Sequence, residues 1–226
     1  MDSLSPVNRK RALFLYGGFP GHRPYEVAKW ARGLMEELDF EVEETQDPHR
    51  FEDDLTVYDL IVLGWTQAQT TEDLTDRAEQ RLLEAARAGT GFAGWHGGVV
   101  ATFQDSPEYL RMVGGVFLYH PEGFLDYEVR ISRSQAAHPI VAGLPDFTVH
   151  TEQYWMLSDS LNTVLATTEF GPPEQPATMP VAWTRNWGAG RIFFSAIGHR
   201  TEDLWDPAVY TLTHRGLVWA SRQVVQ

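Results

Sequence analysis

Residues Gly91-Phe-Ala-Gly-Trp-His-Gly-Gly98 form a short apolar run that ends in a histidine and two glycines. Such a run is typical of a buried strand followed by a tight turn. The run Asp59-Leu-Ile-Val-Leu-Gly64 has the same character. The segment 71–88, with Glu72 and Asp73 in its first turn, predicts a helix between the two strands. Two buried strands joined by a helix favour a parallel sheet.

The same alternation of strand and helix extends toward the N-terminus. Ala12-Leu-Phe-Leu-Tyr16 predicts a first strand, and Pro24 is well placed to open a helix with apolar residues at helical spacing. Phe40-Glu-Val-Glu-Glu-Thr45 alternates like a further strand, whereas residues 46–58 are too weakly patterned to assign. The resulting order β-α-β-β-α-β indicates an α/β fold with a doubly wound, mostly parallel sheet.

The pattern changes after about residue 115. Short strands with turns between them are predicted at 127–131, 147–150, 163–166, 180–183 and 191–195. Asp206 and Pro207 then begin a last helix. We find no repeat and no linker, so we expect one domain over residues 11–226, with additional short strands in its C-terminal half, after a flexible tail of residues 1–10.

Composition excludes several classes of function. Lys and Arg number 18 against 31 Asp and Glu, a net charge of −13 without a basic stripe, which excludes a nucleic-acid binder. The acidic field also disfavours polyphosphates, so no nucleotide cofactor is expected. The chain contains no cysteine, which rules out thiol nucleophiles and Cys-ligated zinc. The N-terminus resembles no signal peptide, and no apolar run of about 18 residues could span a membrane, so we expect a cytoplasmic protein.

Several polar residues follow predicted strands. His22, His96 and His199 come after strands of the expected parallel set, His120 lies in a loop, and Glu152 follows the strand at 147–150. Ligands of open α/β sheets bind beyond the carboxyl ends of the strands. We therefore expect at least two of these five residues to share one pocket.

Segments carrying these residues occur in a characteristic order. They are Trp95-His-Gly-Gly98, Gly114-Gly-x-Phe-x-x-His-Pro121, His138-Pro-Ile-x-x-Gly-Leu144, Thr151-Glu-Gln-Tyr154, and Pro180-Val-x-Trp183 with Gly190-Arg-Ile-Phe193 and Gly198-His199. Each segment alone is a weak signal, but the ordered set is specific. Over residues 11–221 the chain resembles the ThuA-like (trehalose-utilisation) family.

The resemblance implies a class I glutamine-amidotransferase-like fold, related to flavodoxin, and a role in using trehalose and related disaccharides through 3-keto sugars. Amidotransferases carry a cysteine at the turn that corresponds to Gly94–Gly98. This chain has none, so glutamine amidotransferase activity is excluded. The family usually has an acidic pair before the tyrosine. Here Thr151 takes the first position, which leaves Glu152 as a single carboxylate.

The first functional hypothesis is a metal-assisted sugar enzyme. Neutral imidazoles with one carboxylate suit zinc or another divalent transition metal. The expected ligands are His96, His120, Glu152 and His199, with His22 in reserve. Without metal, His96, Glu152 and His199 would be catalytic through acid–base chemistry. Either mechanism describes a sugar hydrolase, lyase or isomerase.

Substrate contacts are expected around this set, where small or aromatic residues flank the polar ones. These contacts are His22, Trp95, Gly97, Gly98, Trp155 and Arg200. The two glycines remove Cβ atoms where a ligand or another backbone segment approaches. Arg200 has a second reading, in which it pairs with Glu202 or Asp203.

Two other functions stay open. A metal-free glycosidase needs two carboxylates, and Glu122, Asp126, Glu152 and Glu202 are the candidates, but no feature marks a pair. A non-catalytic sugar-binding or regulatory protein would use tryptophans that stack on sugar rings, among them Trp65, Trp95, Trp155, Trp183 and Trp187. The expected partner is a small-molecule sugar, and the fold is also compatible with a homo-oligomer.

Overall fold

A nine-stranded mixed sheet runs through the molecule. The structure is a computed structural model, and it describes residues 9–66 and 75–223. In spatial order the strands are β2 (Phe40–Thr45), β1 (Lys10–Gly18), β3 (Leu60–Thr66), β4 (Gly91–Trp95), β11 (Gly190–Ser195), β10 (Ala177–Trp187), β9 (Thr163–Phe170), β6 (Leu125–Ile131) and β7 (Phe147–Thr151).

The sheet is parallel at one end and antiparallel at the other. Strands β2, β1, β3, β4 and β11 pair in parallel, and β11, β10, β9, β6 and β7 pair antiparallel. Residues 12–15 and 60–63 of the central strands are fully buried, as both faces of the parallel half are covered. The predicted β-α-β-β-α-β order of the N-terminal half is confirmed, and the later strands extend the sheet in the antiparallel sense.

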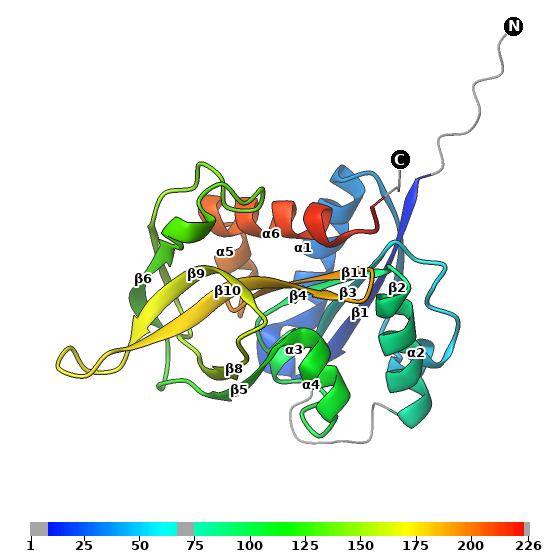
Figure 1. The fold of residues 1–226 in the computed structure, drawn as a ribbon, viewed down its shortest axis with the longest axis horizontal. Coiled ribbons are helices and arrows are strands. Elements are labelled where there is room, and N and C mark those ends of the chain that lie inside the picture. Colours follow the sequence, from blue (N-terminus) through cyan, green and yellow to red (C-terminus); the bar gives the residue numbers. More distant parts are fainter. Residues whose placement is uncertain (1–8, 67–74, 224–226) are drawn as a thin grey trace, which may run out of the picture.

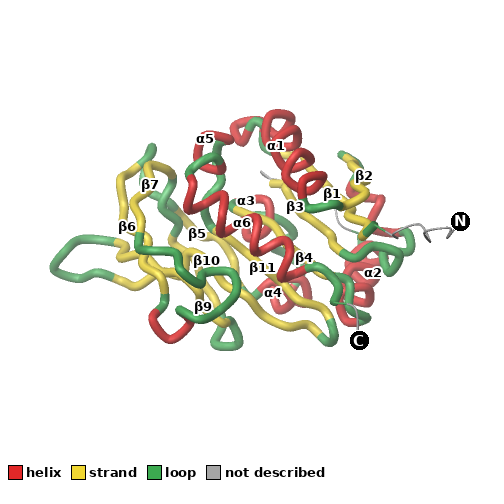
Figure 2. Tube along the Cα trace, turned by 90° about the horizontal axis from the view of Figure 1, so that it is seen from above, coloured by secondary structure: helices red, strands yellow, loops and turns green. Residues whose placement is uncertain are grey.

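Helices cover both faces of the parallel half. They are α1 (Pro24–Glu37), α2 (Asp76–Arg87), α3 (Gly97–Val100), α4 (Pro107–Val113), α5 (Thr201–Leu204) and α6 (Pro207–Ala220). Figure 1 shows α1, α5 and α6 on one face and α2, α3 and α4 on the other. Seen from above, β6, β7 and β9 extend beyond these helices (Figure 2). Among the described residues, no helix is both long enough and apolar enough to cross a membrane.

Some boundaries differ from the sequence prediction. The helix expected at 71–88 begins at Asp76, because the hydroxyl of Thr75 caps it by accepting the backbone N–H of Ala78. Residues 71–74, with Glu72 and Asp73, lie outside the described residues. Lys10, which the prediction placed in the N-terminal tail, belongs to β1, and residues 1–8 lie outside the described part.

Short elements escaped the sequence analysis. The unassigned segment 46–58 contains a 3-10 turn, η2 (Pro48–Glu52), and a second such turn, η1 (Pro20–His22), follows β1. A separate two-stranded sheet pairs β5 (Gly115–Tyr119) with β8 (Trp155–Ser158). Elements of three to five residues contain too few positions to show a hydrophobic period.

Candidate functional site

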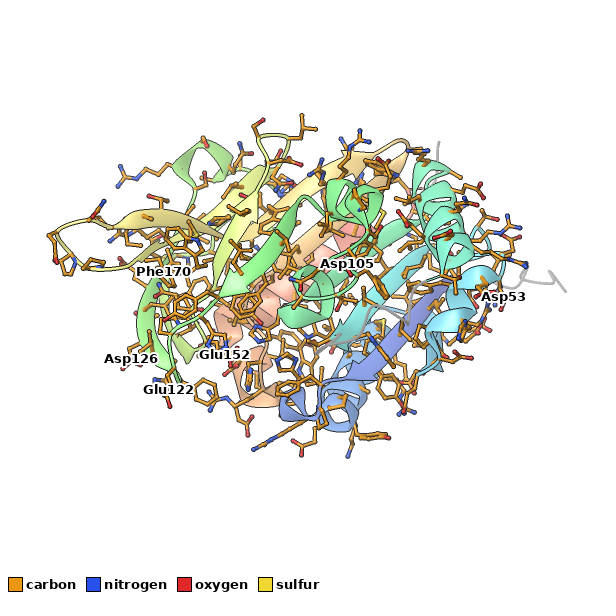
Figure 3. The ribbon with its side chains drawn as sticks, turned by 90° about the horizontal axis from the view of Figure 1, so that it is seen from below. Asp53, Asp105, Glu122, Asp126, Glu152 and Phe170 are labelled. Carbon is orange, nitrogen blue, oxygen red and sulfur yellow. The ribbon has the colours of Figure 1, made fainter. Side chains whose placement is uncertain are left out.

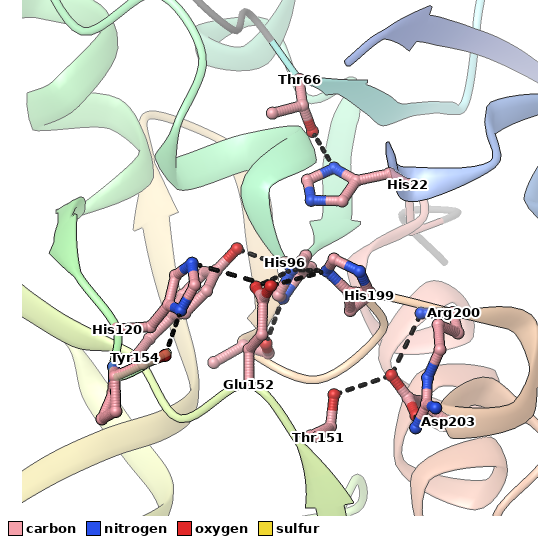
Figure 4. A network of polar contacts seen from close by, with 12 residues as sticks. His22, Thr66, His96, His120, Thr151, Glu152, Tyr154, His199, Arg200 and Asp203 are labelled. Carbon is pink, nitrogen blue, oxygen red and sulfur yellow. Dashed lines mark hydrogen bonds and ion pairs between the residues drawn. The ribbon is translucent and has the colours of Figure 1, made fainter. Parts of the chain in front are cut away.

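Four of the expected residues meet beyond the carboxyl ends of the parallel strands (Figure 4). They are His22 in η1, His96 after β4, Glu152 after β7 and His199 after β11. One ligand atom from each of the four lies within 4.8 Å of the other three. The three histidines come from parallel strands that end at the same edge, and Glu152 reaches them from the antiparallel half. The structure thus brings together four of the five residues, of which at least two were expected to share one pocket.

His96 occupies a sharp turn between β4 and α3, with φ 52° and ψ −148°. A positive φ at a residue with a Cβ costs about 1–3 kcal/mol, so the surrounding structure must hold it in place. The residue is 2% exposed. Its Nδ1 lies 2.9 Å from the carbonyl oxygen of Ala196, and its Nε2 lies 2.7 Å from the hydroxyl of Tyr154. Burial lowers the pKa of His96, so Nδ1–H donates to Ala196 and Nε2 accepts from Tyr154.

The carboxylate of Glu152 lies at the centre of the cluster. Oε1 is 3.1 Å from His199 Nδ1 and Oε2 is 3.1 Å from His96 Nε2. Burial alone would raise the pKa of Glu152, but the hydrogen bond from His199 and the contact with His96 outweigh burial and hold the pKa well below its usual range. Glu152 is therefore ionised, and it suits the role of cation ligand better than that of proton acceptor.

The imidazole of His22 is fixed by its neighbours. Its Nδ1 lies 2.8 Å from the hydroxyl of Thr66, and its ring stands edge-on to His96 and His199 at centroid distances of 4.9 and 4.8 Å. Burial, followed by the adjacent histidines, lowers the pKa of His22 to about 3. A Cβ at Gly97 would lie 3.0 Å from His22 Cε1. Gly97 thus makes room for a side chain of the site itself.

A cavity of about 20 Å³ beside His96 is lined in part by Trp95 and Gly98. It has room for about one water-sized group. Trp95 is 3% exposed and packs edge-on against Trp30 at 5.6 Å, so most of its ring belongs to the core. A Cβ at Gly98 would lie 2.9 Å from the Cα of Gly64, so Gly98 allows two backbone segments to approach. Neither expected substrate contact faces a space large enough for a sugar ring here.

His120 lies at the rim of the cluster, outside the group of four. Its side chain is 33% exposed, and its Nε2 is 3.6 Å from Glu152 Oε1. Its Nδ1 donates to the carbonyl oxygen of Pro121 at 2.6 Å. The fourth member of the group is thus His22, which the sequence analysis kept in reserve, and not His120. The spacing along the chain could not show this, because both residues lie in loops.

Trp155 and Arg200 make other contacts. Trp155 lies in β8 of the small sheet, and its ring packs against Phe170 of β9 at a centroid distance of 5.2 Å. The guanidinium of Arg200 lies over the ring of Phe124 and pairs with Asp203 at 2.8 Å. Of the two readings of Arg200, pairing with a nearby acid is therefore the one observed.

Sequence reasoning assigned no role to Tyr154, which belongs to the site. Its ring stacks on His96 at a centroid distance of 4.3 Å, and its hydroxyl donates to His96 Nε2. Burial raises the pKa of Tyr154 well above its usual value, so the hydroxyl keeps its proton. The signal was present in the segment Thr151-Glu-Gln-Tyr154, but a tyrosine beside a strand is indistinguishable from a core residue without coordinates.

Asp203 joins the two chain segments that carry Glu152 and His199. Its Oδ2 accepts from the hydroxyl of Thr151 at 2.7 Å and from the backbone N–H of Arg200 at 3.0 Å. Asp203 is buried, at 8% exposure. Thr151, the residue next to Glu152, is thus hydrogen-bonded to an acid from α5.

Replacing Asp203 by alanine is expected to lower the free energy of unfolding by about 2–3 kcal/mol, because several hydrogen bonds to a charged acceptor are lost at once. Urea unfolding followed by circular dichroism measures the change. Glu202→Ala is the matched control, since Glu202 lies on the same helix with a side chain that is 63% exposed. Equal midpoints for Asp203→Ala and the wild type would show that this network does not hold the two segments together.

Comparisons with known proteins agree with this arrangement. The family model ThuA, trehalose utilisation, matches residues 11–220. A ThuA-like protein from Parabacteroides merdae ATCC 43184 has a TM-score of 0.78 at 20% identity, covering 96% of this chain and 93% of that one. A ThuA-like protein from Bacteroides uniformis ATCC 8492 has a TM-score of 0.75 at 18% identity, covering 97% and 94%.

A cytoplasmic protein from Salmonella typhimurium LT2 has a TM-score of 0.68 at 12% identity, covering 94% of this chain and 100% of that one. No curated protein gives a significant match. Identities this low show a shared fold, whereas the family model also matches the sequence. Because that match spans nearly the whole chain, the protein belongs to the ThuA (trehalose utilisation) family, which indicates a carbohydrate-related role.

Proposed function

We propose that this protein is a metal-assisted enzyme acting on a disaccharide or on a 3-keto sugar or glycoside. The observation that carries the proposal is the convergence of ligand atoms from His22, His96, Glu152 and His199 within 4.8 Å of one another. Imidazole nitrogens with one carboxylate are the donor set preferred by zinc and related divalent metals.

The outer contacts of these residues fit a metal site. Metal-binding histidines usually donate their other ring N–H to a carbonyl or hydroxyl, which fixes the ring. His96 does so through Ala196, and His22 contacts Thr66 in the same way. Burial keeps the pKa of both histidines low, and the lone pair of His96 Nε2, which accepts from Tyr154 in this structure, would pass to a bound cation. When bound, a divalent metal would polarise a sugar carbonyl or acidify a water molecule.

The chain's own groups supply the proton transfers. A 3-keto glycoside has an acidic C–H beside its carbonyl, and removing that proton leads to elimination, isomerisation or bond cleavage. Because the pKa of Glu152 is held low, we assign the role of proton acceptor to His199 rather than to Glu152. The buried hydroxyl of Tyr154 donates to His96 Nε2, and it would be released to donate into the same space when that nitrogen holds a cation. Hydrolase, lyase and isomerase therefore all remain within the proposal.

A glycosidase that uses two carboxylates receives less support. Asp126 is 80% exposed and pairs with His150, and Glu202 is 63% exposed and lies 3.7 Å from Arg23. Glu122 is also exposed, and with Asp126 it lies at the periphery of the molecule (Figure 3). Among the described residues, Glu152 is the carboxylate that joins the histidine cluster. A non-catalytic sugar-binding protein is the second candidate, and turnover of any keto sugar would eliminate it.

The remaining expectations belong to the same proposal. The order β2-β1-β3-β4-β11, with helices on both faces, supports a doubly wound fold of the glutamine-amidotransferase type. The name of the Salmonella typhimurium protein supports a cytoplasmic location. We further propose that the partner is a small-molecule sugar. We also propose that the protein uses no nucleotide cofactor and binds neither nucleic acid nor membrane. A homo-oligomer stays a prediction.

Elemental analysis tests the metal site directly. Wild-type protein supplied with zinc or manganese and then dialysed is expected to retain about one ion per chain, and His96→Ala is expected to lose it. His150→Ala is the matched control, because His150 is exposed and pairs with Asp126 outside the cluster. Circular dichroism confirms that each variant is folded.

If the wild type retains no more metal than His96→Ala, the metal proposal fails. His96, Glu152 and His199 would then be tested as metal-free acid–base groups in a keto-sugar assay.

A further inference from the structure

A second cavity adjoins the η1 turn, which also carries His22 of the histidine–glutamate cluster. It has a volume of about 420 Å³ and is lined by the ends of β1 and β3, by the start of α1 and by Gln46. Small-molecule sites of proteins typically occupy about 300–1,000 Å³. We call this cavity the β1–β3 cleft.

Its position is the one that an open α/β sheet provides for a ligand. In the spatial order β2-β1-β3, β1 has β2 on one side and β3 on the other, although both follow it in the chain. The chain leaves β1 for α1 and β2 on one side, whereas α2, which follows β3 in the chain and precedes β4, lies on the opposite face of the sheet (Figure 1). A crevice opens at such a point, beyond the carboxyl ends of the strands.

Glycines at the end of β1 shape the floor of the cleft. Gly17 has φ 144°, and a Cβ there would lie 2.4 Å from the six-membered ring of Trp65. Gly18 has φ 75°, and a Cβ there would lie 1.9 Å from the carbonyl oxygen of Thr66. The absence of a Cβ at Gly17 therefore lets the Trp65 indole lie against the backbone of β1, where it forms part of the wall, and Gly18 lets the ends of β1 and β3 approach.

The walls combine aromatic faces with hydroxyl and amide groups. Tyr16, Tyr25 and Trp65 all line the cleft, and Tyr25 is 69% exposed. Gln46 links the two tyrosines: its Nε2 donates to Tyr16 Oη at 3.0 Å, and its Oε1 accepts from Tyr25 at 3.4 Å. The hydroxyl proton of Tyr16 has no acceptor among the described residues. It is therefore free to donate to a ligand.

The charges of the cleft cancel. Arg23 Nη1 lies 3.5 Å from Glu26 Oε2 and 3.7 Å from Glu202 Oε1, so its cation is shared between two carboxylates. No other basic residue is among the described residues that line the cleft. With a net charge of −13 on the chain as well, a phosphate or carboxylate ligand would meet a repulsive field.

We propose that the β1–β3 cleft binds a pyranose ring of an uncharged saccharide. Aromatic faces bury the apolar C–H face of such a ring, while hydroxyl and amide groups satisfy its equatorial hydroxyls. The choice of saccharide as the ligand class rests on the proposed function. The turn η1 forms a wall of the cleft through Pro20 and carries His22 into the cluster, so a ring held here lies one turn of the chain from the reacting groups.

Binding is measured on metal-stripped protein, so that the result does not depend on the metal site. Isothermal titration calorimetry with trehalose, maltose and glucose is expected to show saturable binding to the wild type. Tyr25→Ala is expected to raise the dissociation constant about tenfold through loss of a stacking surface. Gln46→Ala is expected to weaken binding in the same direction. Tyr119→Ala, which removes a 56% exposed tyrosine outside the cleft, is the matched control and should bind as the wild type does.

The outcomes separate this proposal from the metal proposal. Binding that survives in His96→Ala but weakens in Tyr25→Ala places the saccharide in the β1–β3 cleft, whatever the metal analysis shows. The cleft proposal is overturned if none of the three sugars binds, or if Tyr25→Ala and Gln46→Ala bind as tightly as the wild type. Tighter binding of glucose 6-phosphate than of glucose would also overturn it, because the charges of the cleft predict the reverse.

Discussion

Replacing Glu152 by glutamine is expected to lower the turnover of a 3-keto glycoside by about 10³-fold, while the protein stays folded. The two carboxylate oxygens contact His96, His199 and, at longer range, His120. Glutamine has the same shape but carries no charge, so it removes the negative ligand from a cluster of imidazoles. Initial-rate measurements with and without added zinc or manganese give the change in kcat.

Asp126→Asn is the matched control for this substitution. It also converts a carboxylate into an amide, but Asp126 is 80% exposed and pairs with His150. We expect the control to retain wild-type turnover. A Glu152→Gln variant that keeps turnover within about tenfold of the wild type would remove Glu152 from the chemistry and leave it a structural role.

Replacing Trp183 by alanine is expected to lower the free energy of unfolding by about 4 kcal/mol. Trp183 is fully buried in β10, its ring packs on Phe194 at 4.3 Å, and its indole N–H donates to the carbonyl oxygen of Val113 at 2.9 Å. The substitution leaves a cavity and an unpaired carbonyl group. The midpoint of urea-induced unfolding measures the loss.

Trp205→Ala is the control for the loss of an indole ring. Trp205 is 64% exposed, although it stacks on Tyr210, so its removal is expected to cost about 1 kcal/mol or less. Equal losses for the two variants would contradict the assignment of Trp183 to the core. Sequence reasoning had counted Trp183 among the residues that could stack on a sugar, and the structure places it where no sugar reaches.

Much of the N-terminal half was predictable because its elements are long and strongly patterned. The apolar runs at 12–16 and 59–64 are central strands, and Pro24 and Pro207 begin helices where expected. Proline is favourable at the first position of a helix because the backbone N–H that it lacks would have no hydrogen-bond acceptor within the helix there. The short elements α4, β5 and β8 were missed, since four to seven residues are compatible with helix, strand or loop.

The sequence predicted a candidate site of histidines and one carboxylate, but not which residues form it. His96 and His199 were identifiable because each follows an apolar run, and parallel strands bring their ends to one edge. The choice between His22 and His120 required coordinates, because both lie in loops whose path the sequence does not specify. The role of Tyr154 depended on the same information, as its hydroxyl reaches His96 across 58 positions of the chain.

The sequence by itself determined the fold class, the family and the exclusion of thiol chemistry, because these follow from local patterns, ordered motifs and the absence of cysteine. Only the tertiary structure decided which donors converge, that Asp203 supports Thr151, and that the walls of the β1–β3 cleft are aromatic, with charges that cancel. The reason is physical: periodicity reports which face of an element is buried, whereas contacts between elements depend on how the sheet and its loops pack in three dimensions.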